Sequence, residues 1–306
     1  MPNNTNISLL INSCDKYHTA WSPYFELIKK YWPQHPQRIY LNTETASFTC
    51  EGLNIINIYS DPSISWSKRL LNVLRQIPTK YIIFSLEDAF LLDFVNQDTI
   101  ETCIAWMEAT PQIAECRLSA HDCIESGIIW KNSNFRVIPK EHAYRVDTQV
   151  AIWNREMLIS LIDETENPWK FEQNASKRAA NTNWIFLWHY QANKTDVSKM
   201  PFPYLIDQHY GYGIAWGHWL WNNRQWFEKN GIHDVKFKEL GSLSEREVNL
   251  RFKYLYAKEI KGLGKIIRLY LRITTYRKSL FNNLTSLGFQ KGLKRSFQLI
   301  HHKLTK

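Results

Sequence analysis

The first ninety residues alternate short apolar runs with amphipathic segments, and this alternation constrains the fold more than any other feature. Four runs have the length and composition of buried strands, namely residues 7–14, 38–44, 53–60 and 80–88. Two segments between them, residues 22–32 and 65–77, have the apolar spacing of helices that bury one face. Strand–helix–strand repeats of this spacing predict an α/β fold with a mostly parallel central sheet flanked by helices.

The boundaries of these helices are marked by residues that favour helix starts and stops. Ser22 is predicted to cap the first helix and Ser65 the second, because serine oxygens accept the free N–H groups of a first turn. Pro78 is predicted to end the second helix. Further helices are expected over residues 98–109 and from about Arg155 onward.

Several widespread binding motifs are missing from the sequence. No Gly-x-Gly-x-x-Gly follows the first strand and no Gly-x-x-x-x-Gly-Lys-Ser/Thr occurs, which argues against a dinucleotide-binding Rossmann fold and a P-loop. The five cysteines contain no Cys-x-x-Cys pair, so neither a zinc knuckle nor a disulfide scaffold is predicted. The 13 Trp, 15 Tyr and 15 Phe suit stacking on sugars and bases, but most are expected to fill the core.

The net charge of +9 is concentrated at the C-terminal end of the chain. Residues 261–306 contain eleven Lys and Arg and no Asp or Glu, so the remainder is slightly acidic. Residues 260–281 place apolar side chains on one helical stripe and most cations elsewhere. Such a helix either lies on an anionic membrane surface or packs its stripe on the catalytic domain, and the sequence leaves both interpretations open.

The rest of the chain contains no targeting signal of its own. The first residues are polar, and no apolar stretch approaches the roughly 18 residues that span a bilayer. We therefore expect a cytoplasmic protein.

Two acids, Glu87 and Asp88, come at the end of the fourth apolar run. In open α/β sheets ligands bind beyond the carboxyl ends of the strands. A carboxylate at such a position can hold a divalent cation, which in turn neutralises a diphosphate. A helix cap or a solvated loop acid is the alternative.

A third acid, Glu172, lies among aromatic residues that include Trp169 and Phe171. An acid in such surroundings suits a general base, because an apolar environment favours its protonated form. An acid that caps a helix start fits the same residues, and the residues alone favour that interpretation slightly.

The segment of residues 201–221 is rich in Gly, Tyr and Trp and is predicted to be a long structured loop, a feature that is usually functional. It contains His209, Tyr212, Trp216 and His218. His218 is a candidate contact for a metal or a phosphate, and a packed or surface histidine is the alternative.

The order of these segments resembles that of bacterial polysaccharide glycosyltransferases with a GT-A-like fold, which serve capsule, O-antigen and exopolysaccharide assembly. The nucleotide-binding half of that group is resembled by LLINSCDKYHTAWSPYFELIKKYWP, IYLNTE and SWSKRLLNVLRQIPTKYIIFSLEDAFLL. The acceptor half is resembled by YRVDTQVAIWNREMLISLI, PWKFEQNASKRA and GIAWGHWLWNNRQWFEKNGI. Together these segments cover roughly residues 7–235.

The resemblance implies roles for residues on the nucleotide side. Cys14, Asp15 and Tyr17, after the first strand, would lie near the base and ribose of the nucleotide. Trp66 and Arg69, at the start of the second helix, would line the nucleotide pocket.

The resemblance also implies the reacting groups. Asp88, with Glu87 beside it, would take the place of the acid that faces the metal and the diphosphate, and His218 would lie near both. The cation would be Mn²⁺ or Mg²⁺, although a strict Asp-x-Asp is absent and its second acid would fall on Phe90, which cannot be a ligand. Glu172 would be the catalytic base of an inverting reaction.

The predicted organisation is a GT-A-like catalytic domain over residues 1–240 and a basic helical region over residues 241–306. The nucleotide-binding half would span about residues 7–95 and the acceptor half about residues 96–240. Three residues of the acceptor half are expected to shape the sugar sites: Gln149, Trp153 and Trp169.

The predicted function is transfer of a sugar from a nucleotide sugar to a saccharide acceptor that is lipid-linked. The protein would lie at the inner face of the cytoplasmic membrane, held to its anionic surface by the basic tail. A non-catalytic carbohydrate-binding protein of the same fold is one alternative. A basic nucleic-acid-binding protein is another, disfavoured because the body is slightly acidic and contains no recognition motif.

Overall fold

The computed structural model describes residues 6–119, 127–193, 196–204, 213–215, 217–220, 223–233, 235–236 and 242–243. The chain divides into two units, Met1–Ser242 and Leu243–Lys306. The predicted helices of the basic tail and three residues of the predicted aromatic loop lie outside the described residues: His209, Tyr212 and Trp216.

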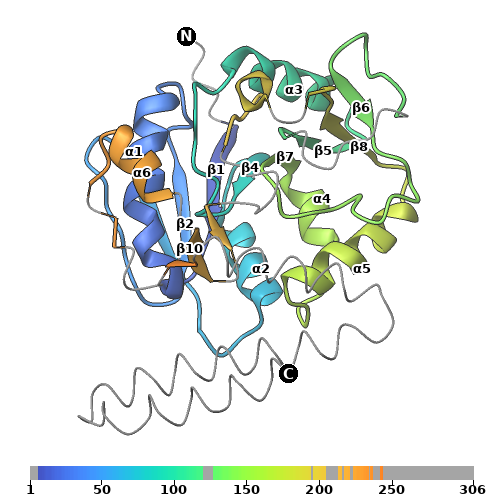
Figure 1. Ribbon diagram of the computed structural model, residues 1–306. Coiled ribbons are helices and arrows are strands. Elements are labelled where there is room, and N and C mark those ends of the chain that lie inside the picture. The colour runs from blue at the N-terminus through green and yellow to red at the C-terminus, as the bar shows by residue number, and fades with distance from the viewer. Residues whose placement is uncertain are drawn as a thin grey trace, which may run out of the picture. The chain divides into compact units, whose positions relative to one another are not determined.

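An eight-stranded sheet forms the centre of the first unit (Figure 1). Its strands are β1 (Ile7–Asn12), β2 (Ile39–Thr43), β3 (Ile55–Tyr59), β4 (Tyr81–Ser85), β5 (Ile113–Arg117), β6 (Phe135–Val137), β7 (Ala151–Asn154) and β8 (Ile185–His189). They lie in the order β3-β2-β1-β4-β7-β5-β8-β6. The pairs β1–β2, β2–β3, β1–β4 and β5–β8 are parallel. The predicted α/β fold with a mostly parallel sheet is confirmed, and β7 enters it antiparallel to both β4 and β5.

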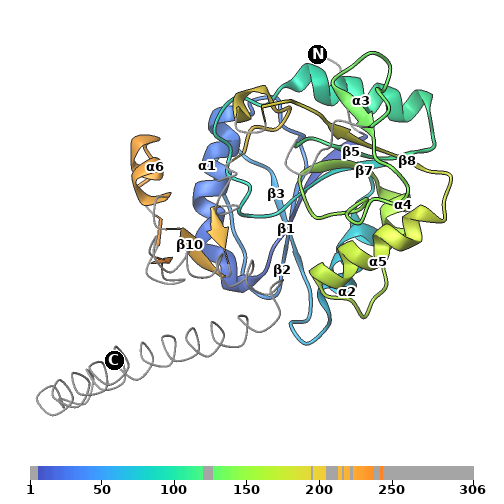
Figure 2. The ribbon, with the colours of Figure 1, turned by 45° about the vertical axis from the view of Figure 1, so that its right-hand side comes forward.

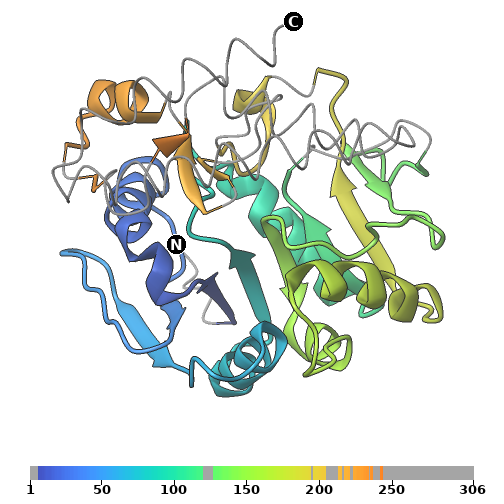
Figure 3. The same ribbon diagram turned by 60° about the horizontal axis from the view of Figure 1, so that its bottom comes forward.

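The helices cover both faces of the sheet (Figure 2, Figure 3). They are α1 (Trp21–Tyr31), α2 (Trp66–Gln76), α3 (Gln97–Ala109), α4 (Arg155–Ser160), α5 (Pro168–Ala180) and α6 (Asn223–Lys229), with 3₁₀ turns η1 (Asp15–Ala20) and η2 (Val197–Lys199). Buried residues of α1 and α3 belong to one core, and those of α2, α4 and α5 belong to the other. In β1, Leu9 and Ile11 face the first core and Leu10 faces the second, as the two-residue period of a strand requires. Burial on both faces explains why β1 has a continuous apolar sequence.

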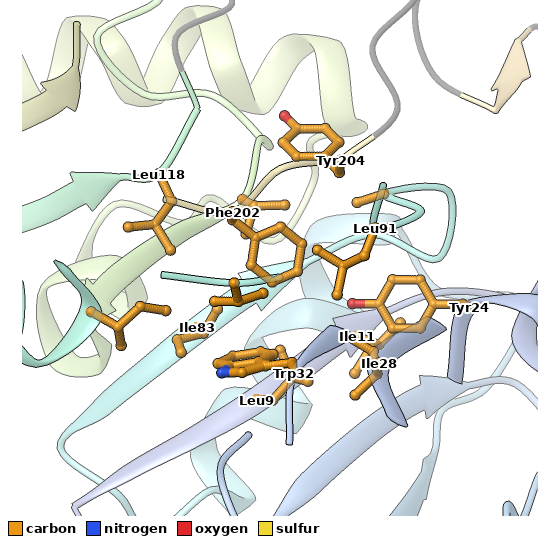
Figure 4. Packing of buried hydrophobic residues seen from close by; sticks show 14 of the residues in the cluster. Leu9, Ile11, Tyr24, Ile28, Trp32, Ile83, Leu91, Leu118, Phe202 and Tyr204 are labelled. Carbon is orange, nitrogen blue, oxygen red and sulfur yellow. The ribbon is translucent and has the colours of Figure 1, made fainter. Parts of the chain in front are cut away.

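The first core joins the N-terminal and C-terminal parts of this unit (Figure 4). Phe202 lies edge-on to Trp32, with ring centroids 5.5 Å apart, and to Tyr204, with centroids 6.1 Å apart. Leu9 and Ile83, from the adjacent strands β1 and β4, complete the packing in the same view. The segment around Phe202 is therefore fixed on the sheet by aromatic contacts.

Helix starts follow the sequence in some places and depart from it in others. Ser65 accepts the Lys68 N–H and caps α2, as predicted. The predicted cap at Ser22 is wrong: α1 begins at Trp21, directly after η1, and its cap residue Ala20 makes no side-chain hydrogen bond. The Trp21 indole donates to the Ser13 hydroxyl at 2.8 Å, which fixes the start of α1 against the end of β1.

Three short strands, β9 (Ile214–Ala215), β10 (His218–Leu220) and β11 (Ser242–Leu243), follow the main sheet along the chain. β9 and β10 pair antiparallel. None of the helices in the described part of the chain has the length and apolar character needed to cross a membrane.

Candidate functional site

The candidate site lies at one edge of the sheet, where β1, β2 and β4 end. The parallel pairing of β1 with β4 runs from Ile7 opposite Tyr81 to Ile11 opposite Ser85. Because β7 is antiparallel to β4, its first residue, Ala151, lies opposite Phe84, near the end of β4. Residues that follow β4 and residues that precede β7 therefore meet at the same edge, which is where open α/β sheets bind ligands.

Asp15 fastens the loop that follows β2. Its carboxylate accepts hydrogen bonds from the backbone N–H groups of Glu44, Thr45 and Ala46 and from the Thr45 hydroxyl at 2.6 Å. Slight burial opposes ionisation, but these donors outweigh it and lower the pKa of Asp15. Asp15 therefore organises the rim of the site, and its carboxylate is occupied by this loop.

Glu44 connects the same loop to α2. One of its carboxylate oxygens accepts the Asp15 N–H at 2.6 Å, and the other is bonded by the Arg69 guanidinium. Arg69, which the sequence placed in the nucleotide pocket, is thus held at the edge of the sheet by an ion pair with Glu44.

Cys14 and Tyr17 contribute neutral groups to the site. Burial, with the charges of Glu87 and Glu44, raises the pKa of the half-buried Cys14 thiol to about 11. Burial and the charges of Glu87 and Asp88 raise the pKa of Tyr17 to about 12. Both side chains remain protonated at neutral pH, and both lie close enough to Glu87 to feel its charge.

The acids after β4 form the most perturbed group at this edge. Burial, together with the neighbouring charge of Asp88, raises the pKa of Glu87, and a hydrogen bond with Ser13 opposes this shift. Burial also raises the pKa of Asp88. Paired carboxylates suit a hard divalent cation. Among the residues that the structure describes, no cluster of three or more His, Cys, Asp or Glu is placed to hold one. The two acids thus fit part of a cation site.

Phe90 occupies the position where a second acid of an Asp-x-Asp motif would stand. Its fully buried ring stacks on Trp219 of β10 and lies edge-on to Phe227 of α6. The position therefore anchors the C-terminal part of this unit to the end of β4.

The turn between β9 and β10 approaches the first loop of the site. Gly217 has φ of +75°, and a Cβ on it would lie 2.7 Å from the Lys16 Nζ and 3.6 Å from the Tyr17 hydroxyl. The positive φ favours glycine here, and the Lys16 ammonium would have to move to make room for a side chain. His218, the next residue, is half-buried, and its predicted contact with a metal or diphosphate stays a prediction.

Glu172 lies in α5, and its carboxylate contacts the segment before β7. Its Oε1 accepts hydrogen bonds from the Thr148 N–H at 3.0 Å and the Thr148 hydroxyl at 2.7 Å. The cap of α5 is Asn167, whose side chain accepts the Lys170 N–H at 3.0 Å, so the capping interpretation of Glu172 is wrong. Because Thr148 precedes β7, Glu172 is held at the same edge as Asp88.

The residues predicted to bind the acceptor sugar lie in different surroundings. Trp169 is 72% exposed at the start of α5. Trp153 is 1% exposed and packs edge-on against Phe186, so its assignment to a sugar site does not agree with its place in the core. The Gln149 side-chain oxygen accepts hydrogen bonds from Ser119 and Tyr204. On the nucleotide side, Trp66 packs on Phe171 with ring centroids 5.5 Å apart.

A buried ionic cluster beside Glu172 was missed by sequence reasoning. Arg117 places Nη1 2.8 Å from Asp147 Oδ2 and Nε 3.1 Å from Glu115 Oε1. Burial raises the pKa of Asp147 to about 8; Arg117 opposes this shift, and the charges of Glu115 and Glu172 add to it. The available signal was a glutamate and an arginine, two residues apart, within a short strand whose other residues are apolar, since buried charges need partners of opposite sign.

Comparison with known proteins adds remote structural similarities. No protein-family model matches the sequence, and the comparison with curated proteins gives no match. S. aureus TarS 1–349 in complex with UDP is 10% identical, with 63% of this chain and 62% of that one covered and a TM-score of 0.42. The mannosyltransferase PcManGT from Pyrobaculum calidifontis, in complex with GDP-Man and Mn²⁺, is 11% identical, with 62% and 55% covered and a TM-score of 0.40. A cytidylyltransferase from Leptospira borgpetersenii is 11% identical, with 63% and 79% covered and a TM-score of 0.38.

The chain spans about 60% of the length of the TarS 1–349 structures that it matches and 38% of a longer TarS structure. At these values of identity and TM-score, the similarity establishes no family for the chain.

Proposed function

We propose that this protein is a glycosyltransferase with a GT-A-like fold that transfers a sugar from a nucleotide sugar to a saccharide acceptor. The observation that carries the proposal is the shared position of two acidic groups. Glu87 and Asp88 follow β4, and Glu172 is held by Thr148 just before β7, so all three lie at one edge of the sheet. The acids after β4 are suited to a cation that neutralises the leaving diphosphate, and Glu172 is suited to accept the proton of the attacking hydroxyl.

The donor would bind over the ends of β1, β2 and β4. The neutral side chains of Cys14 and Tyr17 can contact the base and ribose without repelling the nucleotide. Lys16 supplies positive charge beside them, and the Arg69 guanidinium lies at the same edge in its ion pair with Glu44. Asp15 acts indirectly in this proposal, since it shapes the loop that carries Glu44.

The reaction would be an inverting displacement. The acceptor oxygen forms a bond to the anomeric carbon while the bond from that carbon to the diphosphate breaks, and nucleoside diphosphate leaves. Glu172 accepts the proton of the acceptor hydroxyl, which makes that oxygen a better nucleophile. A divalent cation, for which Asp88 and His218 are the proposed ligands, would neutralise charge on the leaving diphosphate.

The acceptor side would be formed around α5. Trp169 lies three residues before Glu172 and therefore on the same helical face. Its exposed ring offers an apolar surface on which a sugar can stack next to Glu172, the proposed catalytic base. Bacterial surface polysaccharide synthesis, with a lipid-linked acceptor, is the setting that we propose.

Membrane attachment is assigned in this proposal to the basic residues between 261 and 306. Each Lys or Arg near an anionic surface contributes about 1 kcal/mol to binding, and salt screens the attraction. The full-length protein should sediment with anionic liposomes at low salt and be released as salt rises. A chain that ends near Glu259 should stay in solution and still bind donor. Equal sedimentation of both chains, or unfolding of the shorter one, would assign the tail to the core of the protein.

The function is tested by measuring release of nucleoside diphosphate from UDP-, GDP- and dTDP-linked sugars, with and without lipid-linked saccharide acceptors. The proposal expects release that an acceptor accelerates and transfer of the sugar to that acceptor. Sugar binding without release would indicate a carbohydrate-binding protein. Salt-sensitive RNA or DNA binding without any binding of sugar nucleotides would indicate a nucleic-acid-binding protein.

A further inference from the structure

The Glu172 carboxylate is held asymmetrically by one residue. Both hydrogen bonds from Thr148, one from the backbone N–H at 3.0 Å and one from the hydroxyl at 2.7 Å, go to Oε1. In the described part of the chain, no hydrogen bond to Oε2 occurs. A side chain with two donors on one carboxylate oxygen restricts the rotation of that carboxylate.

Thr148 is itself fixed by the residues on either side of it. Val146 donates its N–H to Ser176 of α5 at 3.0 Å. Asp147 is paired with Arg117, and its Oδ1 accepts the Gln149 N–H at 3.0 Å. The segment that carries Thr148 is therefore locked to α5 on one side and to the buried ionic cluster on the other. A catalytic group needs such support, because a small loss of alignment costs rate.

We propose that Thr148 is the positioning residue of Glu172: it occupies Oε1 and leaves Oε2 to accept the proton of the acceptor hydroxyl. This inference rests on the proposed function, since Glu172 is a base only in that reaction. It assigns to Thr148 an effect on the chemical step in addition to any contribution to folding.

Ser176 provides a matched control within the same contact. Its hydroxyl joins α5 to the same segment, through the Glu172 backbone oxygen at 2.6 Å and the Val146 N–H, but does not bond the Glu172 carboxylate. If Thr148 only docks the helix, Thr148→Val and Ser176→Ala should affect the enzyme in the same way. If Thr148 positions the base, the two variants should differ in kcat.

The experiment measures nucleoside diphosphate release by the full-length protein from UDP-, GDP- and dTDP-linked sugars, with water as acceptor. Thr148→Val should lower kcat about ten-fold, the scale of one hydrogen bond to a charged group, and leave the donor KM unchanged. Thr148→Ser, which keeps the hydroxyl, should restore kcat. Ser176→Ala should lower the melting temperature and retain kcat.

A double-variant cycle tests whether Thr148 acts through Glu172. In the Glu172→Gln background, Thr148→Val should cause no further loss of kcat, because the group that it positions has already been removed. Three results would overturn the inference. Thr148→Val could keep the wild-type kcat, or Ser176→Ala could lower kcat as much as Thr148→Val does. Thr148→Val could also lower kcat in the Glu172→Gln background by the same factor as in the wild type. If Thr148→Val does not fold, Thr148→Ala takes its place in every comparison.

The failure of this inference and the failure of the proposed function give different results. A wild-type protein that releases nucleoside diphosphate from none of these sugars overturns the function and the inference together. An active wild type with an equally active Thr148→Val overturns the inference alone.

Discussion

Phe90 stacks on Trp219 with ring centroids 5.7 Å apart and planes 20° from parallel. The contact joins the loop after β4 to a strand that follows it in the chain by more than a hundred residues. Phe227 lies edge-on to both rings, at 5.1 Å from Phe90 and 5.7 Å from Trp219. An apolar residue at the place of a second acid thus has a structural reason: it packs β10, the strand that contains His218, against the loop that follows β4.

Phe90→Ala should therefore destabilise the protein by about 3–5 kcal/mol, the usual cost of emptying a buried aromatic site. Denaturant unfolding measures this change, and protease cleavage between residues 213 and 229 should become faster. Phe94→Ala is the control, because Phe94 is 61% exposed and its removal should cost under about 1 kcal/mol. Equal stability of the two variants would show that the Phe90 stack does not anchor this region.

Asp147 should make the stability of the protein depend on pH. Its pKa is about 8 in the folded state and near 3.8 when unfolded, so the folded state keeps a proton that the unfolded state loses. The stability contributed by the protonated group is complete below about pH 4 and is lost as pH rises toward 8. The free energy of unfolding should thus fall less between pH 5 and pH 8 in Asp147→Asn than in the wild type.

Asp163→Asn is the control for that measurement. Asp163 is exposed, and hydrogen bonds from Thr165 lower its pKa, so it does not titrate between pH 5 and pH 8. The Asp163 variant should keep the wild-type slope. An Asp147 variant with the same slope as the wild type would mean that Arg117 keeps Asp147 ionised throughout this range.

Two tryptophans that the sequence assigned to the same site should behave in opposite ways. Trp169→Ala should change stability by less than about 0.5 kcal/mol, since the side chain is 72% exposed. It should raise the acceptor KM roughly three- to ten-fold, the scale of one aromatic contact, and leave donor binding unchanged. Trp153→Ala should instead destabilise the fold by about 3–5 kcal/mol. An unaltered acceptor KM in Trp169→Ala would remove Trp169 from the acceptor site.

The chemical step should depend on Glu172. Glu172→Gln keeps the size of the side chain and an oxygen that can accept from Thr148, so folding and donor binding should be nearly unchanged. Transfer should fall at least about 10²-fold, as expected for loss of a general base. Glu156→Gln is a matched control, because its side chain is 70% exposed and lies in α4. Near wild-type turnover of purified Glu172→Gln would exclude it as the base.

The architecture was predictable where each strand carries its own signal. β1 and β4 are continuous apolar runs because both of their faces are buried, and the helices between them have clear periodicity. The direction of β7 was not predictable, since its four residues, AIWN, show an apolar segment but nothing about its orientation. The start of α1 was misplaced because the Trp21–Ser13 contact, which fixes it, joins two elements.

The candidate site was predictable only in part, because local sequence does not reveal contacts between distant elements. Acids at the end of an apolar run make Glu87 and Asp88 candidates from local sequence alone. Thr148 was missed because its contact with Glu172 spans 24 residues and depends on where α5 packs. Trp153 was misassigned because an aromatic residue in a short strand has the same local pattern in a core as in a binding site.

The most direct test of the account is a calorimetric titration of the full-length protein with UDP-, GDP- and dTDP-linked sugars in the presence of Mn²⁺, repeated with Asp88→Asn and Asp93→Asn. Asp93 is an exposed acid five residues further on, so its variant controls for loss of charge. The account predicts that at least one sugar nucleotide binds the wild type and Asp93→Asn equally. It predicts that the affinity of Asp88→Asn for that nucleotide is lower than the wild-type affinity by about ten-fold or more, the scale of one lost charge-assisted contact. Binding of none of these nucleotides to the wild type, or equal affinity of all three proteins, would contradict a donor site at the end of β4.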